Sequence, residues 1–241
     1  MELEIVHLYQ DLLNTYGDNG NILLIKRRAE KRGISVKIKN VSVGDSINSA
    51  DILFLGGGQE YEQSLVCDDI IKNRADFLKG YTEDGGVGLF VCGGYQLMGE
   101  YFADASGKKV RGASVLPVRT EGSDGRFTGN IIVNSSLETL VGFENHTGKT
   151  YLEGGESLGE VMFGNGNNGK DKTEGIRYKN AVGTYMHGPL FSKNPALCDD
   201  LIRRAMIRKY GSCVLEPLSD TYELLAKQDM IKKLLKEDGA K

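Results

Sequence analysis

The stretch GLFVCGGYQLMG (Gly88–Gly99) joins an apolar run to a helix-forming run through a cysteine that is followed by two glycines. A strand that turns directly into a helix needs small residues at the turn, and it presents the residue at the turn on the C-terminal edge of the sheet. The N-terminus of the following helix offers free N–H groups and positive partial charge, which favour a thiolate and stabilise an oxyanion. We therefore predict that Cys92 is a nucleophile; a small buried hydrophobic side chain is the alternative.

Strand-like and helix-like runs alternate through the half of the chain that contains this stretch. The expected strands are Glu4–Leu8, Ser35–Val41, Ile52–Leu55 and Val87–Val91. The expected helices cover residues 19–32, about 65–80 and 95–102. Because such alternation builds a parallel sheet covered on both faces, we expect an α/β protein with a mostly parallel sheet flanked by helices.

Residues 108–187 change in character to short strand-like pieces separated by Gly and Asn turns. These pieces are Ala113–Val118, Asn130–Val133, Ser157–Phe163, Gly175–Tyr178 and Ala181–Met186. We expect them to form antiparallel hairpins that extend the same sheet. No Pro/Ser-rich linker divides the chain, which predicts a single domain over residues 1–241.

Two helices are expected to close the chain. Asn194 followed by Pro195 resembles an N-cap and a first-turn proline. A C-terminal helix is expected over about 219–238, where Asp220 and Glu223 resemble a capping box.

Composition excludes several classes of protein. The 241 residues contain 30 Lys and Arg against 33 Asp and Glu, a net charge of −3, which argues against a nucleic-acid binder with a basic stripe. The four cysteines include no CxxC pair, so neither a zinc site nor a thioredoxin-type motif is expected. The N-terminus does not resemble a signal peptide, and apolar runs of only about five residues predict no transmembrane segment. We expect a soluble, cytoplasmic chain with reduced thiols.

A segment that resembles a nucleotide-binding loop is also excluded. Residues 164–170, GNGNNGK, satisfy GxxxxGK, but Asp171 stands where such a loop has the Mg²⁺-binding Ser or Thr, and no helix is expected after it. A flexible hairpin tip is the better interpretation.

A thiol nucleophile generally requires a histidine base, and the chain has three histidines. His7 lies in an apolar strand and is expected to be structural. His187 follows a strand and precedes Gly188 and Pro189, whereas His146 is expected in a loop. Spacing alone does not choose between these two, although a strand-end His187 would share the sheet edge with Cys92.

Several motifs together resemble a known family. They are VCGGYQLMG (91–99), GGGQ (56–59), TYMHGPLF (184–191), YGDNGN (16–21) and GFENH (142–146). The chain resembles the class I glutamine amidotransferases of the cobyric-acid-synthase-like type. Within them it is similar to the GatD-type glutaminase subunits of lipid II isoglutaminyl synthase, from about residue 5 to 210.

The resemblance implies an amidotransferase fold and a mechanism. The Cys92 thiolate would attack the side-chain carbonyl of L-glutamine, and His187 would protonate the departing ammonia and then activate water. Backbone N–H groups of Gly93 and of the Gly57/Gly58 loop would bind the substrate oxyanion.

The resemblance also assigns Arg126 to substrate binding. His187 is followed by Gly-Pro instead of the usual His-x-Glu, so the residue that orients it must come from elsewhere, and we expect Asp18 in YGDNGN to take that place.

The resemblance further implies a heterodimer with a MurT-like Mur ligase. That partner would use ATP and Mg²⁺ to amidate the α-carboxyl of D-glutamate in the lipid II stem peptide, in the cytoplasm at the inner membrane face. No cofactor and no metal are expected in this chain. The alternatives are a cobyric-acid-type glutaminase, a cysteine peptidase and a non-catalytic binding subunit. Activity on free glutamine would separate a glutaminase from a peptidase, and the presence of both Cys92 and His187 argues against a non-catalytic subunit.

Overall fold

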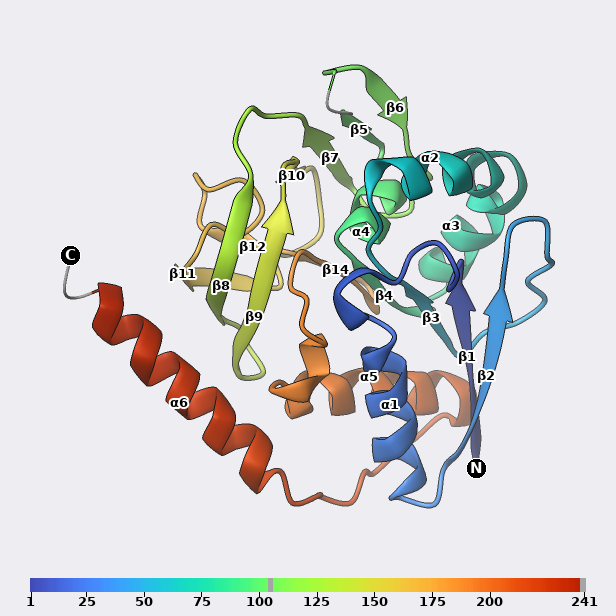
Figure 1. Ribbon diagram of the computed structural model, residues 1–241. Helices are drawn as coiled ribbons and strands as arrows, with labels where there is room; N and C mark the ends of the chain where they lie inside the picture. Colours follow the sequence, from blue (N-terminus) through green and yellow to red (C-terminus); the bar gives the residue numbers. More distant parts are fainter. Residues whose placement is uncertain (104–105, 239–241) are drawn as a thin grey trace.

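A central sheet organises the computed structural model, which describes residues 1–103 and 106–238 (Figure 1). Its strands, in their order across the sheet, are β13 (Ile176–Tyr178), β14 (Ala181–Thr184), β4 (Val87–Val91), β3 (Ile52–Leu55), β1 (Glu2–Leu8) and β2 (Ser35–Val41). All neighbouring pairs in this sheet are parallel except β13 with β14. The expected α/β fold, with a mostly parallel sheet and an antiparallel extension, is confirmed.

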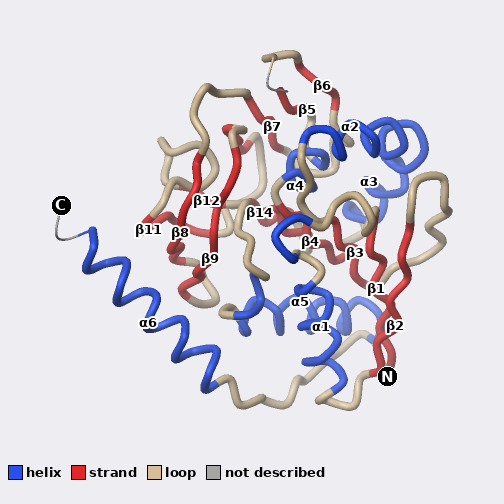
Figure 2. The backbone as a smooth tube through the Cα atoms, in the orientation of Figure 1, coloured by secondary structure: helices blue, strands red, loops and turns tan. Residues whose placement is uncertain are grey.

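Helices cover both faces of this sheet, because successive side chains of a strand point to opposite sides. Ile5, Phe54 and Leu89 belong to the cluster that also contains apolar residues of α1 (Gly20–Glu30) and α5 (Pro195–Tyr210). The alternate positions face the other cluster, which contains apolar residues of α2 (Glu60–Asp69), α3 (Ala75–Glu83) and α4 (Gly93–Met98). Figure 2 shows the two groups of helices on either side of the strands.

The helix expected to end near Gly80 is interrupted by a turn of π-helix, η2 (Ile70–Arg74), and ends at Glu83. The Arg74 side chain lies buried at this turn, where its Nε donates to Asp69 Oδ2 at 2.6 Å. Two short 3₁₀ helices, η1 (Thr15–Gly17) and η3 (Leu190–Ser192), lie in loops.

Two predictions for the region of α4 and the residues after it, a helix over 95–102 and a strand over 113–118, are wrong in their bounds. The expected helix 95–102 ends at Met98, since Gly99 has extended backbone and residues 101–103 form a strand. Residues 113–117 are not a strand: the N–H groups of residues 113–116 donate to carbonyls of residues 97–99 and so satisfy the C-terminus of α4. The strand begins only at Val118.

Of the strand-like pieces expected between residues 108 and 187, the last two form the β13–β14 hairpin and extend the central sheet as expected, whereas the other strands of this region form two separate four-stranded sheets. One contains β10 (Lys149–Leu152), β7 (Val118–Glu121), β5 (Tyr101–Ala103) and β6 (Lys109–Arg111). The other contains β12 (Thr173–Glu174), β11 (Gly159–Phe163), β8 (Phe127–Asn134) and β9 (Thr139–His146). The three-residue β13 ends the central sheet, and its outer edge meets Glu156 in one isolated bridge, so it offers no long edge for a hairpin.

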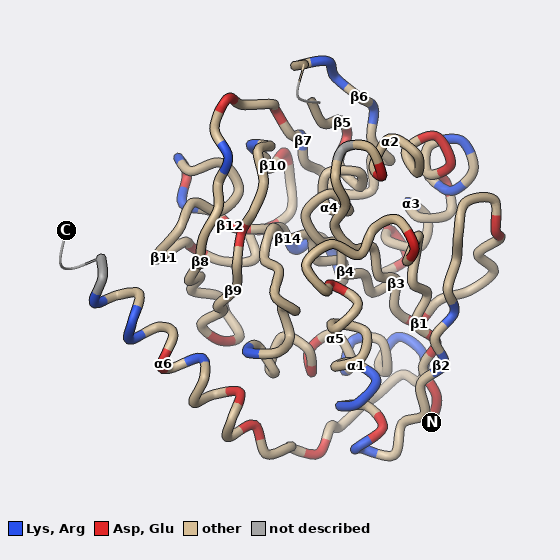
Figure 3. Tube along the Cα trace, viewed as in Figure 1, with Lys and Arg blue, Asp and Glu red and all other residues tan. Residues whose placement is uncertain are grey.

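The last helix, α6 (Thr221–Asp238), agrees with the expected 219–238 and lies along the outside of the molecule, packed on β9 and β11 (Figure 1). Glu223 lies in its first turn and Lys236 in its last, an order that suits the helix dipole (Figure 3). The Asp220 carboxylate does not form the expected capping box but binds the Arg28 guanidinium, with 2.5 Å between Nη1 and Oδ1. Among the described helices, none has the length and apolar character that a membrane span requires.

Candidate active site

Cys92 lies at a sharp turn between β4 and α4. Its backbone has φ 50° and ψ −108°, a left-handed conformation that is costly for a residue with a side chain. The following turn leaves no room for larger residues, because a Cβ on Gly93 would lie 2.4 Å from Gln63 Nε2 and one on Gly94 would lie 2.6 Å from Leu55 O. The strand-turn-helix predicted from the sequence is present, and it places the thiol at the C-terminal edge of the sheet.

His187 and Asp18 meet beside this turn. His187 Nδ1 lies 3.0 Å from Asp18 Oδ1 and 3.2 Å from Oδ2, and both side chains are buried. A Cβ on Gly57 would lie 3.0 Å from His187 Cε1, 3.2 Å from Cys92 Cβ and 3.3 Å from Asp18 Oδ2. Three side chains from distant parts of the sequence therefore converge on a single glycine. Within the described residues, His187 Nε2 has no hydrogen-bond partner.

A backbone bridge to β9 holds the His187 loop. The His187 N–H donates to Phe143 O at 2.8 Å, and the Phe143 N–H donates back to His187 O at 3.3 Å. The Tyr16 ring packs edge-on against the imidazole, with 4.9 Å between ring centroids. The imidazole is thus held in one orientation, with Nδ1 toward Asp18.

The surroundings of His187 favour its charged form. Burial by itself lowers the pKa of the imidazole, but the hydrogen bond to Asp18 and the nearby Cys92 outweigh burial and raise the pKa to about 10. A protonated imidazole beside a thiol stabilises the thiolate, which is the reactive nucleophile.

The raised pKa predicts a pH dependence of stability. Because the His187 pKa is about 10 in the folded chain against 6.5 for the free group, its contribution to stability is complete below pH 6.5 and is lost as pH rises toward 10. The slope is at most about 1.4 kcal/mol per pH unit. Asp18→Asn removes the carboxylate and should flatten this slope. Urea unfolding at pH 6, 7.5 and 9 measures it, and equal slopes in both proteins would contradict the assignment of the partner.

The Gly57/Gly58 loop supports Asp18 directly. The Gly57 N–H donates to Asp18 Oδ2 at 2.9 Å, and Gly57 O accepts hydrogen bonds from the N–H and Oγ1 of Thr15, both at 2.9 Å. The amide of Gly57 is therefore engaged in positioning Asp18. The amides of Gly58 and Gly93 remain as the candidate donors to an oxyanion.

A cavity of about 1160 Å³ opens in front of Cys92 and His187. Arg126 lines it, and its Nη1 donates to Asn145 Oδ1 at 2.6 Å. Tyr16 and Asn145 line it too; neither was expected to have a chemical role, although YGDNGN and GFENH contain them. The cavity is large enough for a small amino acid with room to spare.

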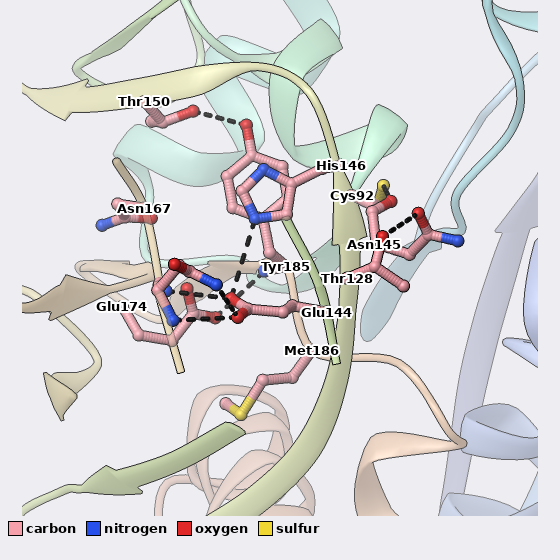
Figure 4. Close-up of polar contacts among 12 residues, drawn as sticks. Cys92, Thr128, Glu144, Asn145, His146, Thr150, Asn167, Glu174, Tyr185 and Met186 are labelled. Atoms are coloured by element: carbon pink, nitrogen blue, oxygen red, sulfur yellow. Dashed lines mark hydrogen bonds and ion pairs between the residues drawn. The ribbon is translucent and has the colours of Figure 1, made fainter. Parts of the chain in front are cut away.

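His146 lies at the end of β9, not in the expected loop. Its Nδ1 is 2.8 Å from Gly148 O, and its ring stacks on Tyr185 with 3.5 Å between centroids (Figure 4). Its Nε2 lies 3.9 Å from the Glu144 carboxylate. Burial lowers the pKa of this imidazole. Of the two histidines that spacing left open, the structure joins His187 and not His146 to Asp18 and the thiol.

A buried polar network behind the site has no obvious signature in the sequence. The Tyr185 hydroxyl lies 2.6 Å from Thr150 Oγ1, and the Tyr185 N–H donates to Glu174 at 3.0 Å (Figure 4). Complete burial raises the pKa of Glu174 to about 7. Glu144 accepts from Asn165 and from the Gly166 N–H. This network and the stacked ring of Tyr185 hold β9, which carries His146, against the segment that leads into His187.

The remaining histidine and cysteines have packing roles. His7 is buried in β1 with its ring edge-on to Phe54, and burial lowers its pKa to about 4. Cys67 and Cys198 are buried free thiols whose pKa values are raised by burial. No group of three or more His, Cys, Asp or Glu residues suited to a metal ion occurs in residues 1–103 and 106–238. Cys92 with His187 and Asp18 beside it provides a thiol with an adjacent acid and base, which suits nucleophilic attack.

Comparison with known proteins points to glutamine amidotransferases. Over 235 residues the chain is 43% identical to the lipid II isoglutaminyl synthase (glutamine-hydrolyzing) subunit GatD of Streptococcus pneumoniae, covering 95% of this chain and 89% of that protein. It is 42% identical over 233 residues to the subunit of the same name from Staphylococcus aureus, covering 95% of each. A solved glutamine amidotransferase shares the fold, with a TM-score of 0.56 and 16% identity over 83% of this chain and 98% of that one. Residues 4–195 match the family described as the CobB/CobQ-like glutamine amidotransferase domain, and the chain belongs to that family.

Proposed function

We propose that this protein hydrolyses L-glutamine and supplies the ammonia to a MurT-type ligase, which amidates the α-carboxyl of D-glutamate in the lipid II stem peptide. The observation that carries the proposal is the convergence of Cys92, His187 and Asp18 around Gly57. The high identity to two GatD subunits over nearly their whole length supports the choice of lipid II over cobyric acid as the pathway.

The first half of the reaction forms a thioester. The Cys92 thiolate attacks the carboxamide carbon of glutamine, and a carbon–sulfur bond forms as the carbonyl oxygen becomes an oxyanion. Donors such as the amides of Gly58 and Gly93 stabilise this oxyanion, at about 3 kcal/mol for each. His187 then protonates the amide nitrogen, the carbon–nitrogen bond breaks and ammonia leaves.

The second half releases glutamate. His187, now neutral, takes a proton from water, and the resulting hydroxide attacks the thioester carbon. The carbon–sulfur bond breaks and regenerates the Cys92 thiolate. Asp18 does not exchange protons in this scheme; it holds Nδ1–H so that Nε2 faces the thiol, a role that a Glu two residues after the histidine has in most related enzymes.

The synthetase chemistry belongs to the partner. ATP and Mg²⁺ are assigned to the ligase, and no cofactor is assigned to this chain. The proposal implies a cytoplasmic heterodimer that works at the inner membrane face, where lipid II carries its stem peptide.

The test is ammonia release from glutamine and its use by the partner. Both reactions are measured on the chain purified alone and on the chain purified together with a Mur-ligase-like protein. We expect the chain alone to form no amidated lipid II. The pair with glutamine and ATP should form it, and ammonium chloride supplied to the ligase should replace this chain. Amidation by this chain alone would contradict the two-subunit scheme, and peptide cleavage without glutaminase activity would favour the peptidase.

A further inference from the structure

Asn145 contacts two functional groups that line the cavity. Its main-chain oxygen lies 3.9 Å from Cys92 Sγ, while its side-chain Oδ1 accepts a hydrogen bond from Arg126 Nη1 at 2.6 Å. One residue therefore contacts both the nucleophile and the cation that the cavity presents.

Three side chains hold the Asn145 carboxamide in place. Its Oδ1 also accepts from Thr128 Oγ1 at 3.2 Å, across the β8–β9 register (Figure 4). Its Nδ2 donates to the Tyr16 hydroxyl. A side chain with partners on β8, on η1 and at Arg126 keeps one rotamer, so it positions the guanidinium at low entropic cost.

The contact leaves Arg126 free to bind an anion. A neutral carboxamide oxygen occupies one N–H donor of the guanidinium without cancelling its charge, and the group has five such donors. Within the described residues, Arg126 forms no ion pair with a carboxylate. The remaining donors suit the two parallel hydrogen bonds that a carboxylate accepts.

We propose that Asn145 is a positioning and specificity residue that selects glutamine by length. Its side chain aims Arg126 at the α-carboxylate, and its main-chain oxygen accepts an N–H of the carboxamide as that group reaches Cys92. Asparagine is one methylene too short to make both contacts, and the product glutamate offers no hydrogen to the main-chain oxygen. This inference rests on the proposed glutaminase activity.

The test compares variants of the full chain, with its synthetase partner present, on glutamine and asparagine. Asn145→Ala should lower kcat/KM for glutamine by about 10- to 100-fold, mainly through KM, because a charge-assisted positioning contact is lost. The preference for glutamine over asparagine should fall with it. Alkylation of Cys92 by iodoacetamide, which needs no Arg126, should keep its wild-type rate. Asn134→Ala, on the exposed end of β8, is the matched control and should leave kcat/KM for glutamine and the preference over asparagine unchanged.

Two further variants separate positioning from a general loss of structure. Asn145→Asp is nearly isosteric, and its carboxylate would pair with Arg126 and compete with the substrate, so KM should rise further than in Asn145→Ala. In Arg126→Ala, the added Asn145→Ala should cost nothing more, because both act on the same carboxylate.

Multiplicative losses in the double variant, or an Asn145→Ala enzyme with an unchanged KM and unchanged preference, would overturn the role of Asn145. A wild-type chain that releases no ammonia from glutamine with the partner present would instead overturn the proposed function.

Discussion

Replacement of Cys92 by serine is expected to abolish ammonia release from glutamine, with a loss on the order of 10⁴-fold or more. A hydroxyl at the same position remains protonated, and it is a far weaker nucleophile than the thiolate that a protonated His187 stabilises. The side chains have nearly the same shape, so the strained turn at φ 50° should form in both proteins. Ammonia release and thermal unfolding measured on the same samples test the prediction.

Cys213→Ser is the matched control. This half-buried free thiol is not among the residues that line the cavity, so its replacement should leave turnover unchanged. Undiminished turnover by a folded Cys92→Ser protein would remove the basis for the thioester mechanism.

Replacement of His187 by alanine is expected to lower turnover by about 10³-fold, within the range typical of a general acid and base. The loss should appear in kcat, because no other described group bridges the thiol and Asp18 in this site. Single-turnover measurements should show slow thioester formation and slow hydrolysis, since the imidazole acts in both steps.

His146→Ala is the matched histidine variant. The His146 ring stacks on Tyr185, and its Nδ1 is paired with Gly148 O and not with Asp18. Its removal should therefore lower the melting temperature, while turnover stays within a few-fold of the wild type. If His146→Ala lost turnover at an unchanged melting temperature and His187→Ala did not, the two roles would have to be exchanged.

The central strands were predictable from the sequence. Ser35–Val41 begins and ends with its alternating pattern, and Ile52–Leu55 and Val87–Val91 begin and end with their apolar runs, because each is bounded by turn residues. Residues 139–146 were not recognised as a strand, and 113–117 were wrongly expected to be one. A half-buried antiparallel strand is stabilised by its partners, and those partners are distant in the sequence.

The active site shows the same difference between features set by neighbouring residues and features set by distant ones. The turn at Cys92 depends on contiguous residues, a buried strand followed by two glycines, so the sequence by itself determined where the thiol would be presented. The choice of His187 over His146 depended on a contact between residues 169 positions apart, Asp18 and His187, and only the tertiary structure decided it. The bridge from Asn145 to Arg126 and Tyr16 was equally beyond local patterns, because it requires β9, the start of β8 and η1 to meet at one cavity. Turn geometry is a local property of the chain, whereas a catalytic constellation is created by packing that brings distant segments together.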